Sequence, residues 1–460
     1  MVFVLPGVKF DLEMIKKYDN PTPRYTSYPP ATELNAEFTT GDFQGAIAAS
    51  NNRKSPLSLY FHIPFCESAC YFCGCNTVIS RNKNIAKPYV EHLAREIKNM
   101  ARLIDPDRTV LQVHWGGGTP NYLNQDQVKF LWEQIRENFN IDLQAEISIE
   151  INPSYVDQEY IFFLREVGFN RVSFGIQDFN PQVQLAVNRI QPEELLFNAM
   201  SWIRAAKFQS VNVDLIYGLP YQTLERFQET IQKTIKLDPN RIAVFNFAYV
   251  PWMKPAQKNI PEAALPQPQE KLKILKMTIE EMTKNQYLFI GMDHFAKNHD
   301  ELAIAQQNRT LQRNFQGYTT HSSTELLGFG ATSISMLHDA YVQNHKKLKD
   351  YYQAISADII PLSKGIKLNQ DDIIRRDVIM SIMSHFHLHK QDIAEKYHIN
   401  FDEYFAHELA ALAQLQADGL VNISTHHIQI TDIGRLLVRN IAVIFDNYHQ
   451  TKERRFSRSI

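Results

Sequence analysis

Cysteine is scarce in this chain of 460 residues: only four are present, and all lie within ten residues, between Cys66 and Cys75. A disulfide scaffold distributes its cysteines so that they close large loops, and so tight a cluster cannot do this. The sequence therefore excludes a disulfide-stabilised fold. Because the rest of the chain carries no thiol, we expect a reducing compartment and a local purpose for the four cysteines.

Long hydrophobic runs and an excess of one charge are also missing. No apolar stretch approaches the roughly 18 residues that a membrane helix needs. The first residues, MVFVLPGVKFDLEMIKKYD, lack the basic start and apolar centre of a signal peptide. The 48 Lys and Arg nearly balance the 50 Asp and Glu, which favours neither nucleic acid nor an anionic membrane as a partner. We expect a cytoplasmic protein, and nothing demands more than a monomer.

Short β-rich runs alternate with helical ones from about residue 58 to 286. The predicted strands are 58–63, 110–115, 145–151, 171–177, 211–217 and 241–249. The predicted helices are 87–104, 125–138, 155–168, 192–207, 223–237 and 268–285. Such alternation builds βαβ units around a parallel sheet, and six units are two short of a closed eight-stranded barrel. We therefore predict an α/β fold with a partial, TIM-like (β/α)6 barrel.

Both ends of the chain differ from this middle part. The beginning contains the irregular segment PTPRYTSYPP, and near the end helical patterns surround a probable hairpin, GLVNISTHHIQIT. The order helix, hairpin, helix resembles a winged-helix module. The length allows two or three domains. We predict an N-terminal arm (1–50), a catalytic domain with an extension (51–360) and a mainly helical, winged-helix-like C-terminal domain (361–460).

Three of the predicted strands alternate apolar and polar residues, so that each has one apolar and one polar face. The polar faces carry Glu150, Gln177 and Asp214 at the carboxyl ends of three different strands, where barrel enzymes collect their catalytic groups. An apolar face packed on helices leaves the polar face to line the lumen. This suggests a ligand or water inside, because an unpaired buried charge is costly. The alternative is a polar network that the protein satisfies by itself.

The four cysteines follow the first predicted strand in the run HIPFCESACYFCGCN, with the spacing C-x3-C-x2-C-x-C. A structural zinc site usually takes its ligands from two separated knuckles, whereas iron–sulfur cubes are held by thiolates from short runs of this kind. Three thiolates would leave one iron of a cube open to a small molecule. A zinc knuckle and unligated thiols are the alternatives.

The run HWGGGTP, 114–120, ends the second predicted strand. Its glycines let the backbone approach a ligand closely and adopt φ values that other residues avoid. The alternative is a tight turn between a strand and a helix. Because the run lies at the same rim as the cysteines, we favour a binding role.

The spacing C-x3-C-x2-C after a first strand resembles the radical S-adenosylmethionine (SAM) superfamily. A closer resemblance, to the oxygen-independent coproporphyrinogen III oxidases (or dehydrogenases), runs nearly from end to end of the chain. The motifs that carry it are PRYTSYP (23–29), YFHIPFCESACYFCGCN (60–76), HWGGGTP (114–120), AEISIEINP (145–153), GIQDFN (175–180), VDLIYGLP (213–220), GMDHFA (291–296) and NFQGYTT (314–320). The resemblance implies that the partial barrel is of the radical SAM type.

The resemblance implies a 4Fe–4S cluster and two SAM molecules, one on the cluster and one beside it. The positions that match cluster ligands are Cys66, Cys70 and Cys73. Those that match contacts of the first SAM are Tyr60, Gly117, Glu150 and Ile334. Those that match contacts of the second SAM are Phe72, Gly118, Thr119, Gln177, Arg189 and Asp214, and Ala248 matches a contact of either. Cys75 belongs to the family pattern outside the triad, which implies a functional, catalytic residue that is no cluster ligand.

The resemblance also implies the reaction. Electron transfer from the reduced cluster would cleave SAM to methionine and a 5′-deoxyadenosyl radical, which would take a hydrogen atom from a propionate side chain. Loss of CO2 and one electron would then leave a vinyl group. Two such steps convert coproporphyrinogen III to protoporphyrinogen IX in haem biosynthesis. An unidentified reductant would supply the cluster, and Arg24 and Arg313 are candidates, on charge alone, for partners of the polyanionic substrate.

Other interpretations stay open. A haem-degrading radical enzyme could share this barrel, and so could a haem chaperone of the same family. Such chaperones typically lack the PRYTSYP arm and the fourth cysteine, and both are present here. A structural or electron-carrying cluster protein would not explain a polar lumen.

Two further features of the C-terminal part invite a function that we do not favour. His385, His387 and His389 form an H-x-H-x-H run, which we interpret as a solvated face and not as a metal site. Acidic side chains slightly outnumber basic ones from 371 to 460, whereas binding to a phosphate backbone needs a basic surface. We therefore expect a cover for the substrate there and not a DNA-binding module.

Overall fold

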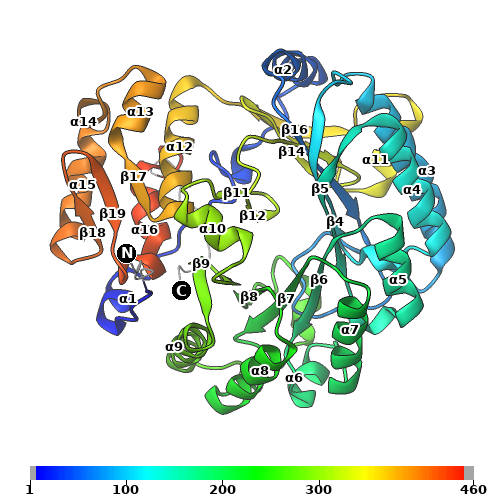
Figure 1. Ribbon diagram of the computed structural model, residues 1–460, viewed down its shortest axis with the longest axis horizontal. Helices are drawn as coiled ribbons and strands as arrows, with labels where there is room; N and C mark the ends of the chain where they lie inside the picture. Colours follow the sequence, from blue (N-terminus) through cyan, green and yellow to red (C-terminus); the bar gives the residue numbers. More distant parts are fainter. Residues whose placement is uncertain (1–6, 450–460) are drawn as a thin grey trace. The chain divides into compact units, whose positions relative to one another are not determined.

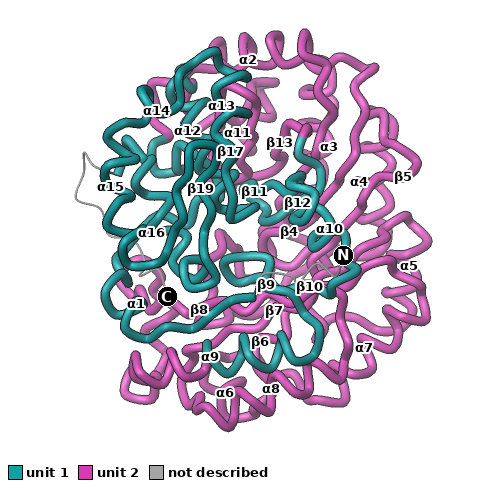
Figure 2. Tube along the Cα trace, turned by 60° about the vertical axis from the view of Figure 1, so that its left-hand side comes forward, with its two compact units in different colours: residues 1–33, 275–322, 368–460 teal, residues 34–274, 323–367 magenta. Residues whose placement is uncertain are grey.

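The computed structural model describes residues 7–449. Contacts between residues divide the chain into two compact units, and neither is continuous in the sequence (Figure 2). Unit 1 contains the residues up to Glu33, Leu275–Ser322 and the residues from Leu368 on, and unit 2 contains Leu34–Ile274 and Ser323–Lys367. The three-part division that the sequence suggests stays a prediction, and its last part extends beyond the described residues.

Unit 2 is built around a sheet in which ten strands follow one another in the order β16-β15-β14-β13-β1-β4-β5-β6-β7-β8. In chain order they are β1 (Leu57–Ile63), β4 (Thr109–Gly117), β5 (Asn140–Ile151), β6 (Arg171–Gln177), β7 (Ser210–Tyr217), β8 (Arg241–Asn246), β13 (Glu325–Phe329), β14 (Ile334–Met336), β15 (Ala340–Asn344) and β16 (Leu362–Lys367). Neighbours from β13 through β1 to β8 are parallel. From β13 to β16 the strands pair antiparallel.

Within the described residues, unit 2 also contains nine α-helices. They are α2 (Thr40–Arg53), α3 (Ala86–Ala101), α4 (Gln125–Asn138), α5 (Gln158–Val167), α6 (Pro181–Ala186), α7 (Glu193–Ala205), α8 (Leu224–Leu237), α9 (Pro268–Lys284, which ends in unit 1) and α11 (Leu348–Ser356). Of these, α3 to α8 connect the parallel strands. In Figure 1, α3, α4, α5 and α7 lie along the outer side of β4 to β7. The six predicted strands and six predicted helices are all present, so the predicted partial (β/α)6 barrel is confirmed.

Helix α8 illustrates why these segments become helices. The Thr223 side chain accepts a hydrogen bond from the backbone N–H of Arg226 and so caps the first turn, and Asp238 ends the helix in the left-handed conformation. Phe227 and Ile231, four residues apart, are buried on one face. Local capping and a single apolar stripe thus agree with the helical period of the sequence.

Strand register separates the two faces of the sheet. On the apolar face, Trp115 lies opposite Ile149, and both are completely buried. On the polar face, Gln112 donates to Glu146 at 3.0 Å, and Arg171 forms an ion pair with the same carboxylate at 3.0 Å. The Glu146 carboxylate in this inner polar layer is therefore paired with protein groups. The polar side chains nearer the carboxyl ends of the strands form the candidate site described below.

Unit 1 is mainly helical with small sheets. Its elements are α1 (Leu12–Tyr18), β9 (Tyr287–Gly291), β10 (His294–Lys297), α10 (Glu301–Gln307), β11 (Gln312–Asn314), β12 (Gly317–Thr319), α12 (Gln370–His385), β17 (His387–His389), α13 (Lys390–Tyr397), α14 (Phe401–Tyr404), α15 (Ala406–Ala417), β18 (Val421–Ile423), β19 (His427–Ile430) and α16 (Val438–Ala442). The predicted hairpin is β18 with β19, and β17 joins it as a third strand. No helix within residues 7–449 has the length and hydropathy of a membrane span.

Hydrogen bonds join the N-terminal segment of unit 1 to the segment 439–446. The Arg439 guanidinium donates to the carbonyl oxygens of Thr22 and Pro23, and the Tyr25 hydroxyl donates to Asp446 at 2.8 Å. All of these groups belong to buried residues. The segment that looked irregular in the sequence is therefore ordered by contacts more than 400 residues away in the chain.

The three histidines of the H-x-H-x-H run are half-buried and not fully solvated, so this part of the interpretation needs correction. His385 ends α12 and bonds to the carbonyl oxygen of Leu311 at 2.7 Å. His387 stacks on His427 with 5.4 Å between ring centres, and His389 pairs with Asp392. The run leads from α12 into β17, which contacts α12 and pairs with β19, so one side of the run is buried.

Candidate functional site

The cysteine loop leaves β1 and is framed by two short parallel strands, β2 (Phe65–Cys66) and β3 (Val78–Ile79). The loop is held to the segment after α6 by two hydrogen bonds. The backbone N–H of Tyr71 donates to the carbonyl of Val187 at 3.0 Å, and the Asn188 side chain donates to the carbonyl of Ala69 at 2.8 Å. The position of the loop is thus fixed by backbone contacts at both sides of Cys70.

An apolar cluster supports the middle of the cysteine loop. Tyr71 and Phe72 pack against the buried side chains of Val183, Val187 and Phe247. The amide of Gln257 also reaches the carbonyl of Phe72, at 3.5 Å. Burial of these aromatic rings anchors the loop, because it removes a large apolar area from water.

Each of the three predicted ligand thiols has a hydrogen-bond donor beside its sulfur. The Sγ of Cys66 lies 3.2 Å from the Thr119 hydroxyl, and Arg189 donates to the Sγ of Cys70 at 3.5 Å. The backbone N–H of Cys75 donates to the Sγ of Cys73 at 3.4 Å. All three thiols are free and half-buried, whereas Cys75 is exposed. Such donors stabilise negative charge on sulfur, as thiolate ligands require.

The three thiols do not converge on one point. Within the described range, residues 7–449, no three His, Cys, Asp or Glu side chains are placed to hold a single metal ion. Thiolates that bind different irons of a cube do not need a common point. A short run of closely spaced cysteines is typical of the ligands of such a cube.

The glycine run at the end of β4 packs directly on the cysteine loop. The backbone N–H of Gly118 donates to the carbonyl of Ile63 at 2.8 Å, and that of Thr119 donates to the carbonyl of Phe65 at 2.9 Å. A Cβ atom on Gly118 would lie 2.7 Å from the Pro64 carbonyl. At Gly117 φ is +114°, and a Cβ atom would lie 2.5 Å from the His62 ring. Gly117 and Gly118 are therefore required because His62 and Pro64 lie too close for a side chain, independently of any ligand.

Glu150, at the end of β5, lies beside this turn. Its carboxylate accepts a hydrogen bond from the backbone N–H of Gly117 at 3.2 Å and contacts Nε2 of His114 at 3.2 Å. His114 also contacts the Ser148 hydroxyl and stacks on Tyr60, with 5.9 Å between ring centres. Burial by itself would raise the pKa of Glu150, but the contacts with His114 and Gly117 outweigh it and lower the pKa.

Asp214, on β7, is fixed by side chains from two strands. The Asn212 amide donates to it at 2.8 Å and the Ser173 hydroxyl at 3.4 Å. Burial raises the pKa of Asp214 to about 7, and the negative charge of Glu150 adds to this rise. Two carboxylates with different proton affinities therefore face the same lumen, Glu150 charged and Asp214 close to half-protonated at neutral pH.

Gln177 and Arg189 meet at the end of β6. Gln177 adopts a left-handed backbone conformation, with φ of +69°. Arg189 donates to the carbonyl of Gly175 at 2.7 Å, next to its contact with Cys70. A Cβ atom on Gly175 would lie 2.2 Å from the Gln177 amide. The structure thus links the predicted residues of β6 to the cysteine loop through one guanidinium.

Two predicted contacts lie at the margins of this group. Ile334 is in β14, and its backbone packs on Gly328, which is the register partner of Tyr60. Ala248 is exposed just after β8, where its carbonyl accepts from Gln257 at 3.1 Å. Both therefore adjoin strands or loops that carry other predicted residues.

Sequence reasoning missed two histidines that the structure places at the centre of the site. His62 is buried, and its ring lies between the Tyr60 hydroxyl at 3.0 Å and the carbonyl of Asn76 at 3.1 Å. His114 joins Tyr60 to Glu150, as described above. Both histidines lie inside the sequence motifs named above. His114 is two residues from Gln112 and so lies on the same polar face of β4, and this alternation could have identified it.

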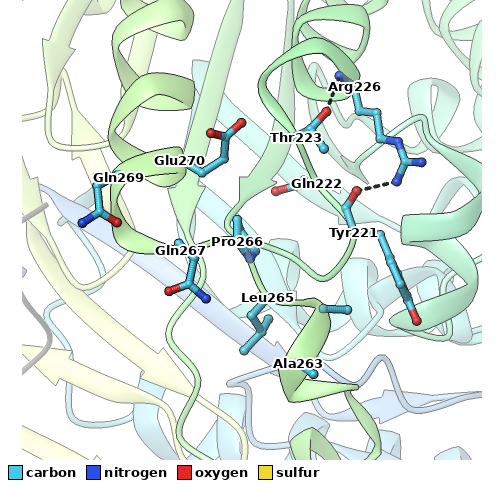
Figure 3. A pocket seen from close by; sticks show the side chains of 11 residues that line it. Tyr221, Gln222, Thr223, Arg226, Ala263, Leu265, Pro266, Gln267, Gln269 and Glu270 are labelled. Carbon is cyan, nitrogen blue, oxygen red and sulfur yellow. Dashed lines mark hydrogen bonds between the residues drawn. The ribbon is translucent and has the colours of Figure 1, made fainter.

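A surface pocket elsewhere in unit 2 does not coincide with this group. It has a volume of about 570 Å³ and is lined by polar and small side chains that include Tyr221, Arg226 and Glu270 (Figure 3). Arg226 points back to the carbonyl of Tyr221, at 2.6 Å. None of the lining residues belongs to the cysteine loop or to a strand end described above, so the pocket carries no part of the candidate site.

Comparison with known proteins gives consistent results along the whole chain. Residues 60–234 match the model of the radical SAM superfamily, and residues 368–437 match the HemN C-terminal domain. The chain is 58% identical to an oxygen-independent coproporphyrinogen III oxidase of Synechocystis sp. over the full length of both proteins. It is 48% identical to the Escherichia coli protein of that name, over 98% of this chain and 99% of the relative.

A solved structure agrees with these relatives. Coproporphyrinogen III oxidase (HemN) from Escherichia coli, a radical SAM enzyme, superposes with a TM-score of 0.92 at 47% identity. The match covers 96% of this chain and 99% of that structure. The similarity thus includes both the barrel strands that carry the cysteine loop and the helical C-terminal part.

Proposed function

The chain belongs to the family of oxygen-independent coproporphyrinogen III oxidases, which makes it a radical SAM enzyme, and from this we propose the reaction and the residues that serve it. The reaction is the oxidative decarboxylation of two propionate side chains of coproporphyrinogen III, which gives the vinyl groups of protoporphyrinogen IX in haem biosynthesis. Each propionate loses CO2, one hydrogen atom and one electron.

The observation that carries the proposal is the set of three half-buried thiols at the rim of the barrel, each next to a hydrogen-bond donor. Cys66, Cys70 and Cys73 would hold a 4Fe–4S cluster and leave one iron for SAM. When bound, the cluster and SAM supply a carbon-centred radical that can take a hydrogen atom from an unactivated carbon. The protein holds and orients these groups and excludes other molecules that could donate a hydrogen atom to the radical.

The carboxylates and glycines at the strand ends are suited to hold SAM. For the first molecule we propose Tyr60, Gly117, Glu150 and Ile334. For the second we propose Phe72, Gly118, Thr119, Gln177, Arg189 and Asp214, with Ala248 as a contact of either. A carboxylate such as Glu150 can accept hydrogen bonds from ribose hydroxyls or pair with an ammonium group.

Cys75 has a different place in the proposal. It is exposed, and its backbone N–H donates a hydrogen bond to the sulfur of Cys73. We assign it a catalytic role that does not include binding the cluster. We also propose that the enzyme works as a cytoplasmic monomer, takes electrons from a separate reductant, and has neither nucleic acid nor a membrane as a partner.

Anaerobic reconstitution tests the proposed reaction. Purified protein is supplied with iron, sulfide, a one-electron reductant, SAM and coproporphyrinogen III. We expect protoporphyrinogen IX together with 5′-deoxyadenosine and methionine. Tight haem binding without vinyl product would instead support a haem chaperone, and 5′-deoxyadenosine with haem as the consumed substrate would support a haem-degrading enzyme.

The affinity for SAM should increase with pH around neutrality. The pKa of Asp214 is raised to about 7, so the carboxylate form that accepts ribose hydroxyls is populated above that pH and lost below it. We expect the KM for SAM to fall about tenfold between about pH 6 and about pH 8, the slope of a single titrating group. Steady-state kinetics at both pH values check this, and Asp214→Asn should flatten the profile. An equal slope in both proteins would exclude Asp214 as the titrating group.

A further inference from the structure

Arg313 in unit 1 is a buried arginine with unused hydrogen-bond donors. It is the middle residue of β11, and only 4% of its surface is exposed. Its guanidinium lies over the ring of Tyr318, 4.7 Å from the ring centre. Its Nε and Nη1 atoms have no hydrogen-bond partner among the described residues. An arginine that is removed from water normally has its donors paired, because the cost of leaving them unpaired is high.

Other buried arginines of this chain show what a structural role looks like here. Arg108 bonds to Glu325 at 2.8 Å, to the hydroxyl of Ser50 and to the carbonyl of Ser55. Arg375 bonds to Asp371 and Glu408 and to a backbone carbonyl. Both guanidiniums are neutralised by carboxylates of the protein. Arg313 has no such partner among the contacts described, which sets it apart from these two.

Two further arginines of unit 1 lie near Arg313. Burial lowers the pKa of Arg439 to about 9. The positive charges of Arg24 and, to a smaller extent, Arg313 add to this effect, and Tyr25 and Asp19 oppose it. Arg24 forms an ion pair with Asp293, and its side chain remains 37% exposed. A concentration of positive charge in a buried place is costly unless an anion compensates it.

We propose that Arg313 and Arg24 form a carboxylate-binding site for propionate side chains of the substrate. The planar guanidinium fork matches a carboxylate with two parallel hydrogen bonds. Arg24 already pairs with the carboxylate of Asp293, so an incoming propionate would have to replace this internal partner. Arg439 is fastened to the carbonyls of Thr22 and Pro23 and holds the arm that carries Arg24. This inference rests on the proposed function, because it takes the tetrapyrrole as the ligand.

The site would act on binding and not on the radical step. Coproporphyrinogen III carries four propionates, of which two react, so the remaining two are free for permanent contacts. Charge-assisted hydrogen bonds from Arg313 would hold one of them, and the exposed Arg24 could exchange Asp293 for an incoming carboxylate. Loss of either contact should raise KM and leave kcat at saturating substrate nearly unchanged.

The test uses full-length holoenzyme and the variants Arg313→Lys, Arg313→Gln and Arg24→Gln. The matched control is Arg309→Gln, which removes the same charge from an exposed position of the same unit. Titration with coproporphyrin III, the oxidised form of the substrate, gives Kd, and anaerobic kinetics give KM and kcat. We expect Kd and KM to rise at least tenfold in the Arg313 variants and in Arg24→Gln, and to stay within twofold in Arg309→Gln. Cluster absorbance per chain should stay constant.

The outcomes separate this inference from the proposed function. If the wild type makes vinyl product but Arg313→Lys and Arg24→Gln keep its KM and Kd, the carboxylate site is wrong and the reaction stands. If the wild type makes no vinyl product, the proposed reaction itself fails. A merely structural Arg313 would lower the melting temperature and cluster content without changing Kd in the folded fraction, and this too would overturn the site. Should Arg313→Gln not fold, Arg313→Lys and Arg24→Gln decide.

Discussion

Replacement of Cys66, Cys70 or Cys73 by serine is expected to remove both the brown iron–sulfur chromophore and all turnover. A serine hydroxyl keeps its proton at neutral pH and cannot replace a thiolate on iron, and three ligands leave no spare one to compensate for the loss. Each of the three sulfurs also has its own donor, from Thr119, Arg189 or the backbone of Cys75, so none is redundant in the structure. Iron and sulfide content, the visible spectrum and product formation under anaerobic conditions provide the measurements.

Cys75→Ser is the matched control for this series, because it removes a thiol from the same loop outside the proposed ligand set. It should retain the full chromophore, since the contact to Cys73 comes from a backbone N–H that the substitution leaves in place. Turnover should nevertheless fall if Cys75 has the catalytic role proposed above. A variant of Cys66, Cys70 or Cys73 that keeps a complete cluster would remove that residue from the ligand set.

The second large effect is expected at Asp214. Asp214→Ala should keep the iron content of the wild type and lower turnover at subsaturating SAM about a hundredfold, because a hydrogen bond to a charged group contributes about 1.5–3 kcal/mol. The carboxylate is held by Asn212 and Ser173 and contacts no cysteine, so its removal leaves the ligand set intact. Iron analysis, SAM binding and the rate of 5′-deoxyadenosine formation distinguish the loss of SAM binding from the loss of the cluster.

Asp142→Ala provides the comparison for Asp214→Ala. Asp142 lies near the amino end of β5, where it accepts from the backbone N–H of Gln144 at 2.7 Å. It is away from the carboxyl ends of the strands, so turnover should stay close to that of the wild type. An iron content that collapses in Asp214→Ala would show that this residue holds the fold and not SAM.

Much of the barrel could be predicted because its segments obey simple periods. The segment 125–138 was predicted to the residue, since Asn124 and Gln127 form a capping box at its start and Val128, Leu131 and Ile135 repeat on one face. The strands β13 to β16 were not predicted. They are three to six residues long, and β13 pairs with β1 across more than 260 residues of chain. A short apolar run gives no local signal of so distant a partner.

The candidate site was predicted unevenly for a similar reason. Cysteine spacing and strand alternation are local patterns, and they brought out the run of four cysteines together with Glu150, Gln177 and Asp214. The choice of Cys66, Cys70 and Cys73 as ligands came from the family resemblance. The close packing of Gly117 on His62 and of Gly118 on Pro64 is a contact between distant segments. The sequence therefore suggested that these glycines make room for a ligand. The structure shows that they make room for His62 and Pro64 of the same chain. No local pattern showed that Arg313 would be buried without a carboxylate beside it.

The fastening of the arm to the last residues of unit 1 has a consequence for synthesis on the ribosome. Thr22, Pro23 and Tyr25 are translated more than 400 residues before their partners Arg439 and Asp446. Strand β1 likewise can pair with β13 only after β13 has been synthesised. Neither unit can be completed co-translationally, because contacts of such sequence separation close late. A nascent chain that stops before residue 439 would leave the arm without these contacts, so translation through Asp446 is a precondition for the assembly of unit 1.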